Sequence, residues 1–210
     1  MSRALCWNLA LAACVLLLPL ARAGADDDYR AGQQAFARGD VVGAMTPLRR
    51  GAAAGHAPSQ SLLGFILENA GLVDEAAGLY RQAAAQGHAD AQAALAGLYL
   101  VGRGVPHDER EAFVLFSRAA ASGHATAIKV VADVYLRDDV RMLGDDRSDA
   151  LALAALRRAA EADHLPTIDR LVLVYQRGEL GVPADAAEAE RWQARAAKLR
   201  PRPPAAGSKK

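Results

Sequence analysis

A repeating unit, marked by histidines at positions 56, 88, 124 and 164, is the feature that most constrains what this chain can fold into. Each unit ends in a pair whose second member is histidine, and the pairs are Gly55-His56, Gly87-His88, Gly123-His124 and Asp163-His164. Apolar residues stand at three fixed places, seven and eleven positions after each histidine and eight positions before it. Regular repetition at this spacing is typical of helical units that stack into an array.

The best-defined unit, residues 89–124, has the pattern of two helices joined by a loop. Ala91, Leu95 and Leu98 recur at three- and four-residue spacing, which places them on one helical face. A glycine- and proline-containing stretch then ends the first helix, and Asp108 can cap the second. Gly123 suits the left-handed position that closes a helix. A single hairpin of this kind cannot bury its apolar face, so it requires neighbours of its own type.

The spacing between these apolar anchors shows where the repeat is rigid and where it varies. The step from a second helix to the next first helix is always the same: Leu48 to Leu63, Tyr80 to Leu95, Phe116 to Val131 and Leu156 to Leu171. Within a hairpin the step lengthens from one repeat to the next: Leu67 to Tyr80, Tyr99 to Phe116 and Tyr135 to Leu156. The joint between hairpins is therefore fixed, whereas the loop inside each hairpin varies and emerges on one edge of the array.

These patterns predict an all-α fold, a right-handed α/α solenoid of about five helical hairpin repeats over residues 24–200. Leu95, Tyr99 and Phe116 are predicted to lie on the shared apolar faces of the best repeat, and Trp192 is interpreted as core packing in the last one. The mixed-charge stretch 137–147 replaces the short loop of the fourth repeat, and we interpret it as a solvated loop or as a loop that contacts a partner.

Two groups of these residues match a known repeat motif. The first comprises Leu63-Gly64, Leu67, Tyr99, Gly102, Gly104-Val105-Pro106, Asp108, Ala112, Leu115-Phe116, Ala119-Ala120 and Gly123. The second comprises Tyr175, Gly181-Val182-Pro183, Asp185, Ala189, Trp192 and Ala196-Ala197. Together they resemble the Sel1-like repeat family, which is similar to tetratricopeptide repeats but has a longer loop within each hairpin. The resemblance covers roughly residues 29–200, although residues 125–164 lack the Gly-x-Gly-Val loop. It implies a protein-binding α/α solenoid, often in the bacterial envelope, and no catalytic residues.

The two ends of the chain have compositions unlike the repeats. Residues 1–23 combine Arg3, an apolar run and an Ala21-Arg22-Ala23 cleavage site, which predicts a secretory signal peptide and no membrane span after its removal. A retained anchor and a lipoprotein attached through Cys14 are the alternatives. Residues 201–210 are predicted to be a disordered basic tail.

Cleavage would also change the chemistry available to the chain. Cys6 and Cys14 both lie in the removed segment, so the mature chain has no disulfide and no thiolate metal ligand. Loss of Arg3 and Arg22 takes the formal charge from +1 to −1. A near-neutral chain has no overall electrostatic attraction for nucleic acid, so we expect no nucleic-acid partner.

The sequence offers no catalytic, cofactor or metal site. Four of the five histidines stand at repeat ends. Equivalent positions in stacked helices are roughly 8–10 Å apart, too far for the nitrogens to share one zinc ion. We interpret them as helix C-terminal residues that the helix dipole favours. No Ser-His-Asp order, HExxH, P-loop or GxGxxG motif is present.

A partner-binding face can be predicted from the helical register. Positions five, nine and thirteen after each marker histidine turn away from the core anchors, and in the first helices they should line the inner curve of the solenoid. Those positions are small or apolar in the earlier repeats and charged in the later ones. The candidate binding residues are Phe65, Lys129, Asp133, Arg137 and Arg177. The alternative is that Phe65 packs against a neighbouring repeat and the charges form a solvated face.

The function predicted from these features is an exported, non-enzymatic scaffold that binds protein or peptide partners in the bacterial cell envelope through a helical-repeat groove. The alternative is an envelope enzyme, or an enzyme accessory, that acts on cell-wall polymer. A hydrolase would show an acid or histidine of shifted pKa in one cleft, whereas a scaffold would show a groove with dispersed polar groups.

Overall fold

The computed structural model describes residues 24–143 and 148–200, and within these ranges all regular structure is helical. The predicted signal peptide, residues 1–23, and the predicted tail, residues 201–210, lie outside the described residues. The helices are residues 24–37, α2 (Val41–Ala53), α3 (Ala57–Asn69), α4 (Val73–Ala85), α5 (Ala89–Val101), α6 (Glu109–Ala121), α7 (Ala125–Arg137), α8 (Val140–Leu143), α9 (Asp149–Glu161), α10 (Leu165–Arg177) and α11 (Ala186–Leu199). No described helix combines the length and the apolar character needed to cross a membrane.

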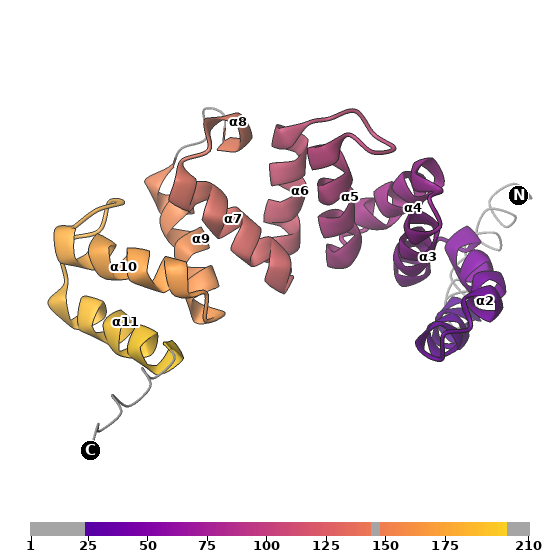
Figure 1. Cartoon of the computed structure of the whole chain (residues 1–210), viewed down its shortest axis with the longest axis horizontal. Coiled ribbons are helices and arrows are strands. Elements are labelled where there is room, and N and C mark those ends of the chain that lie inside the picture. The colour runs from indigo at the N-terminus through magenta and orange to yellow at the C-terminus, as the bar shows by residue number, and fades with distance from the viewer. Residues whose placement is uncertain (1–23, 144–147, 201–210) are drawn as a thin grey trace, which may run out of the picture. The chain divides into compact units, whose positions relative to one another are not determined.

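The helices follow one another as five helix–loop–helix hairpins (Figure 1). The predicted all-α solenoid of hairpin repeats is thereby confirmed. Helices α2 to α7, α9 and α10 are each 13 residues long, so the differences in repeat length lie in the loops, as the anchor spacing predicts. The chain divides into two compact units, called unit 1 (Met1–Ala119) and unit 2 (Ala120–Lys210) below.

The predicted anchors form the core of each unit. The residues seven after the marker histidines are at most 7% exposed, and those eight before them are at most 6% exposed. They are Leu63, Leu95, Val131 and Leu171, and Leu48, Tyr80, Phe116 and Leu156. Trp192 is also buried, at 4% exposed. The third set is less uniform, because Leu67 and Tyr175 are buried whereas Tyr99 and Tyr135 are only partly covered.

The joint between hairpins corrects the interpretation of the histidines. They begin the following helix as N-cap residues, and do not end the preceding one, because the glycine before each of the first three takes the left-handed position, with φ between 79° and 88°. The Nδ1 atoms of His56, His88 and His124 accept backbone N–H groups of Ser59, Ala91 and Ala127 at 3.4, 3.4 and 3.1 Å. An acceptor at this place satisfies one of the free N–H groups of the first helical turn.

A buried glutamine completes the same joint in unit 1. Four positions after the marker, Gln60 donates to the carbonyl of Ala52 and Gln92 to that of Ala84, each at 3.2 Å. Each glutamine thus satisfies a carbonyl at the end of the preceding helix while the histidine caps the next one. In unit 2 the corresponding residue of α10 is the fully buried Ile168, so the joint is apolar there.

Two glycines allow close approaches in unit 1. A Cβ on Gly64 in α3 would lie 2.9 Å from the ring of Tyr80 in α4, so the tyrosine packs directly on the backbone. Gly104 has φ +66, and a Cβ there would lie 2.8 Å from the carbonyl oxygen of Val73. The loop within the third hairpin therefore rests on the second hairpin.

Within the stretch 137–147, the described residues 137–143 are more structured than a simple solvated loop. Asp138 ends α7 with a left-handed backbone, and the short helix α8 follows. Leu143 at the end of α8 is only 3% exposed and belongs to the core. This apolar side chain therefore anchors the charged stretch to the core. Residues 144–147 lie outside the described residues.

Candidate functional site

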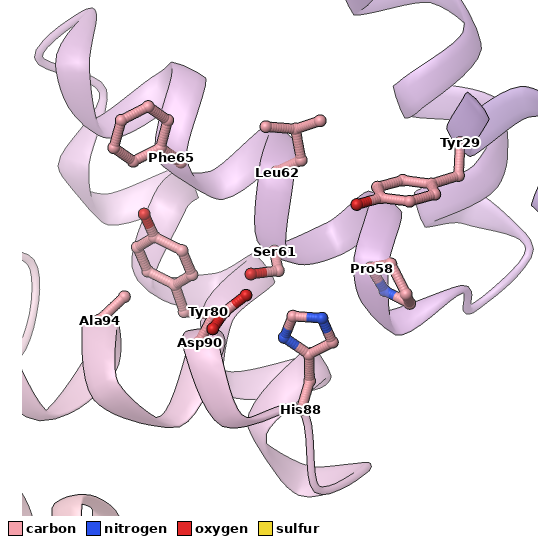
Figure 2. A pocket seen from close by; sticks show the side chains of 9 residues that line it. All are labelled: Tyr29, Pro58, Ser61, Leu62, Phe65, Tyr80, His88, Asp90 and Ala94. Atoms are coloured by element: carbon pink, nitrogen blue, oxygen red, sulfur yellow. The ribbon is translucent and has the colours of Figure 1, made fainter. Parts of the chain in front are cut away.

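The candidate site is a pocket of about 230 Å³ in unit 1 (Figure 2). It is formed by the N-terminal helix and by α3, α4 and α5 with the cap before α5. The lining residues are Tyr29, Pro58, Ser61, Leu62, Phe65, Tyr80, His88, Asp90 and Ala94. Figure 2 shows Tyr29 and Pro58 on one side, Phe65 and Tyr80 on the other, and Ser61 and Asp90 between them.

Phe65 combines the two interpretations that the sequence left open. Its ring meets the ring of Phe36 from the preceding hairpin edge to face, with centroids 6.0 Å apart. The residue is nevertheless 47% exposed and lines the pocket. It therefore packs against a neighbouring repeat and still offers a large apolar surface to a partner. Exposed aromatic side chains of this kind contribute strongly at protein interfaces.

Tyr80 and Ser61 give the pocket hydrogen-bond acceptors. The Tyr80 hydroxyl donates a hydrogen bond to the Glu68 carboxylate at 2.9 Å, so its oxygen can only accept from a ligand. Burial, and then this bond to the Glu68 carboxylate, raise the pKa of Tyr80 well above its usual range. Ser61 stands at a position predicted to face away from the core, but it is only 8% exposed. That prediction is wrong for Ser61, which is buried.

His88 lies at the lower end of the pocket in the view of Figure 2, and Tyr29 lies at its right-hand side. Burial lowers the pKa of His88, against an opposing effect of Asp90, and the nearby His56 lowers it further. The ring is therefore neutral at neutral pH, which its acceptor role at the cap of α5 requires. Burial, and secondarily the charge of Asp90, raise the pKa of Tyr29, so this phenol is neutral too.

The four predicted charged residues lie in unit 2, separate from this pocket. Lys129, Asp133 and Arg137 follow one another along one face of α7, and Lys129 and Arg137 are exposed. Asp133 lies 3.8 Å from Nε2 of His164, and Arg177 lies 3.6 Å from Glu179. Their placement on outward-facing positions follows the register. Whether they bind a partner remains a prediction.

The prediction missed Tyr29, which forms one wall of the pocket. Register positions were counted from the marker histidines, and the first hairpin has no histidine before it. The close match between the first two hairpins could have identified Tyr29. The distance along the chain from Gly32 to Gly64 is the same as that from Tyr29 to Ser61, so Tyr29 and Ser61 occupy the same place in successive repeats.

A second hollow, of about 450 Å³, lies in unit 2 beside Tyr175 and Trp192. Here the aromatic rings are already covered by arginines of the chain itself. The Arg157 guanidinium lies 5.7 Å from the Tyr175 ring centroid, and those of Arg191 and Arg195 lie 5.6 and 5.9 Å from the Trp192 ring. Arg157 also donates from Nε to the Tyr175 hydroxyl at 2.9 Å. Because these side chains occupy the rings, the hollow is a weaker candidate than the pocket of unit 1.

Across residues 24–143 and 148–200, no three histidine, cysteine, aspartate or glutamate side chains gather closely enough to hold a metal ion. The stacked hairpins and the pocket that they form define a helical-repeat protein of the α/α solenoid class. Proteins of this class present side chains from successive repeats on one extended surface.

Three segments, residues 58–88, 89–124 and 173–200, match the Sel1 repeat family. The predicted resemblance is therefore confirmed. Sel1 repeats mediate protein–protein interactions, and proteins built from them are typically non-enzymatic scaffolds. The matched segments coincide with α3–α4, α5–α6 and the end of α10 with α11.

Solved structures with the same fold extend the comparison. A protective antigen present in uropathogenic Escherichia coli strains, which displays an SLR fold, matches with a TM-score of 0.65 and 27% identity. The match covers 87% of this chain and 40% of the antigen, so this chain spans less than half of that protein. A Sel1 repeat protein from Oxalobacter formigenes has a TM-score of 0.60 and 24% identity over 84% of this chain and 74% of its own. No curated protein matches the chain.

Proposed function

We propose that this protein is an exported, non-enzymatic scaffold of the bacterial cell envelope that binds a protein or peptide segment in the aromatic pocket of unit 1. The observation that carries the proposal is the half-exposed Phe65 ring, held by Phe36 beside a pocket of about 230 Å³. A rigidly held aromatic ring loses little conformational freedom on binding, so its contact area contributes to affinity.

Export is supported by the signal-like sequence of residues 1–23. The test is mass spectrometry of the mature protein purified from cells, which should begin at Gly24. A protein that begins at Met1, or that carries lipid on Cys14, would contradict this part of the proposal.

Binding at the pocket can be tested with a photo-crosslinking residue placed at position 65 in the full chain, expressed in its native envelope. Leu72 provides a matched control, because it is also 47% exposed and lies outside the pocket. We expect a defined crosslinked partner from position 65 and none from position 72. Phe65→Ala should abolish capture of that partner by the affinity-tagged chain, whereas Leu72→Ala should retain it.

The same capture experiment separates the pocket from the charged face of unit 2. Circular dichroism should first establish that each variant is folded. If folded Phe65→Ala captures the partner as well as wild type, the pocket is not the site. Loss of capture by Arg137→Glu or Arg177→Glu would then assign binding to unit 2, with the stretch 137–147 as the next candidate.

A further inference from the structure

We propose that the pocket of unit 1 selects an arginine side chain of the bound segment, held between Tyr29 and Phe65 with its guanidinium directed at Asp90. This inference rests on the proposed function, because it names the chemistry of the peptide that the pocket accepts. It follows from the charge of the pocket, from the direction of its hydrogen bonds and from a comparison with unit 2.

The pocket carries negative charge. Among its nine lining residues Asp90 is the one acidic side chain, and the lowered pKa of His88 keeps that ring neutral at neutral pH. A second carboxylate, that of Glu68, accepts a hydrogen bond from the Tyr80 hydroxyl at 2.9 Å. No lysine or arginine is among the residues that line the pocket. The electrostatic field inside it therefore favours a cation.

Three of the polar side chains that line the pocket, Tyr80, Asp90 and Ser61, can accept hydrogen bonds, while the neutral Tyr29 and His88 side chains can each donate one. The Tyr80 hydroxyl donates its hydrogen bond to Glu68, so its oxygen can accept from a ligand, and the Asp90 carboxylate can accept as well. The Ser61 hydroxyl lies between the two walls and can turn to accept as well (Figure 2). A guanidinium brings five N–H donors in one plane, which suits several acceptors around a narrow opening better than the three donors of an ammonium group.

The two walls provide flat surfaces for the same group. Tyr29 and Phe65 both line the pocket with aromatic rings, and a guanidinium is attracted to such faces at distances of up to about 6 Å. Unit 2 shows that this chain stabilises guanidinium groups on aromatic rings, as Arg157 on Tyr175 does. In the described part of unit 1, no arginine of the chain lies over Tyr29 or Phe65. The Tyr29 ring contacts the His56 ring and the Phe65 ring contacts the Phe36 ring, with centroids 5.5 and 6.0 Å apart, so the surfaces that Tyr29 and Phe65 turn toward the pocket are the ones that an arginine of a partner would contact.

The experiment uses the full mature chain and fluorescently labelled peptides of sequence Gly-Pro-Xaa-Pro-Gly, followed by fluorescence anisotropy at low salt. Xaa is arginine, its neutral isostere citrulline, lysine or glutamate. We expect the arginine peptide to bind about tenfold more tightly than the citrulline peptide and more tightly than the lysine peptide, with no binding of the glutamate peptide, because a charge-assisted hydrogen bond is roughly twice as strong as a neutral one.

Two variants test the assignment within the pocket. Asp90→Asn should weaken the arginine peptide about tenfold and remove its advantage over citrulline, whereas Asp74→Asn, an exposed carboxylate outside the pocket, should change neither. Asp90 also stands in the first turn of α5, so Tyr29→Leu provides a second test that leaves that helix end intact. It should weaken the arginine peptide more than the citrulline peptide.

The inference is overturned if the arginine and citrulline peptides bind equally, if none of the peptides binds, or if folded Asp90→Asn keeps the wild-type preference. Crosslinking from position 65 distinguishes this result from failure of the proposed function. Crosslinking that persists without arginine selectivity contradicts only the arginine inference, whereas loss of crosslinking contradicts peptide binding at the pocket itself.

Discussion

Helix α5 of unit 1 and helix α10 of unit 2 are each the first helix of a hairpin. They share the same buried anchor positions, called the frame below, but differ on their outer faces. In α5 and α10 the residue seven after the marker is a buried leucine, Leu95 or Leu171. Two positions later the outer face bears Gly97 in α5 and the 37% exposed Leu173 in α10. The charges along α7 and α10 are largely engaged within unit 2, as in the 2.7 Å pair of Arg200 and Asp169.

This difference teaches that packing fixes one set of positions and leaves another free. A buried anchor must fill the space between helices, so leucine recurs there in both units. An outward position meets only solvent or a partner, so its chemistry can differ from repeat to repeat at little cost in stability. Phe65 in the pocket of unit 1 and Asp133 on the charged face of unit 2 both stand nine positions after a marker histidine, so one register position serves different chemistry in the two units.

The strongest test of the common frame is truncation of its anchors. Leu95→Ala in unit 1 and Leu171→Ala in unit 2 should each lower the free energy of unfolding by on the order of 2–5 kcal/mol, because each removes a buried side chain and leaves a cavity. Leu173→Ala, on the outer face of α10, should change it by no more than about 0.5 kcal/mol. Urea denaturation followed by circular dichroism measures all three. Equal stability of the Leu95→Ala variant and wild type would show that the core face is misassigned.

Two glycines of unit 1 allow the same substitution to be compared at a packed position, Gly64 in α3, and at an open position, Gly97 in α5. Gly64→Ala should destabilise the protein by about 1–3 kcal/mol, because the new methyl group collides with the Tyr80 ring. Gly97→Ala meets no atom within 4 Å and should stabilise it by about 0.5–1 kcal/mol through higher helix propensity. Denaturation of both variants provides the measurement, and a shift in the same direction for the two would contradict the close contact at Gly64.

The capping histidine of α5 should make unit 1 sensitive to acid. The pKa of His88 is lowered in the folded state from its ordinary value of 6.5. Stability from the neutral ring is therefore fully present above pH 6.5 and decreases as the pH falls below 6.5 and through the folded-state pKa. His88→Asn keeps a good N-cap without a titrating group, so it should match wild type at pH 8 and lose less stability at pH 5. Parallel acid-induced losses in both proteins would exclude a contribution from His88.

The smallest effects are expected from the paired charges of unit 2. The side chains of Arg200 and Asp169 are 56% and 44% exposed, and such pairs contribute about 0.2–1 kcal/mol. Asp169→Asn should therefore lower the free energy of unfolding by less than about 1 kcal/mol, and the difference should shrink in 0.5 M salt. A larger loss that salt does not reduce would mean that Asp169 belongs to the frame and not to the outer face.

Much of the fold was predictable because helical repeats are governed by local periodicity. The spacing of Leu63, Leu95 and Leu171 identified the buried face, since residues at fixed helical intervals must point the same way. The constant step between hairpins correctly located the rigid joints, and the variable steps correctly located the loops. The histidines were assigned to the wrong helix ends because so few residues separate the two helices that the sequence alone does not show which helix each histidine caps. The left-handed glycine before each of the first three histidines ends the preceding helix, so the histidine caps the following one.

The candidate site was less predictable, because it is assembled from residues that lie far apart in the chain. Phe65 could be named from its register position, but the sequence did not say whether its ring would be covered. Tyr29 and His88 come from different repeats, with the whole second hairpin between them in the chain, yet they line one pocket.

By itself, the sequence determined that this chain is a stack of helical hairpins, which residues hold each hairpin together and where the loops vary. Those properties depend on contacts within one hairpin or across one short joint, and helical periodicity encodes them directly. Only the tertiary structure decided that Ser61 is covered, that Phe65 remains half open against Phe36 and that Asp90 shares a pocket with two tyrosines. The depth and charge of a pocket depend on the packing of side chains from three successive hairpins, and the spacing of residues along the chain does not specify that packing.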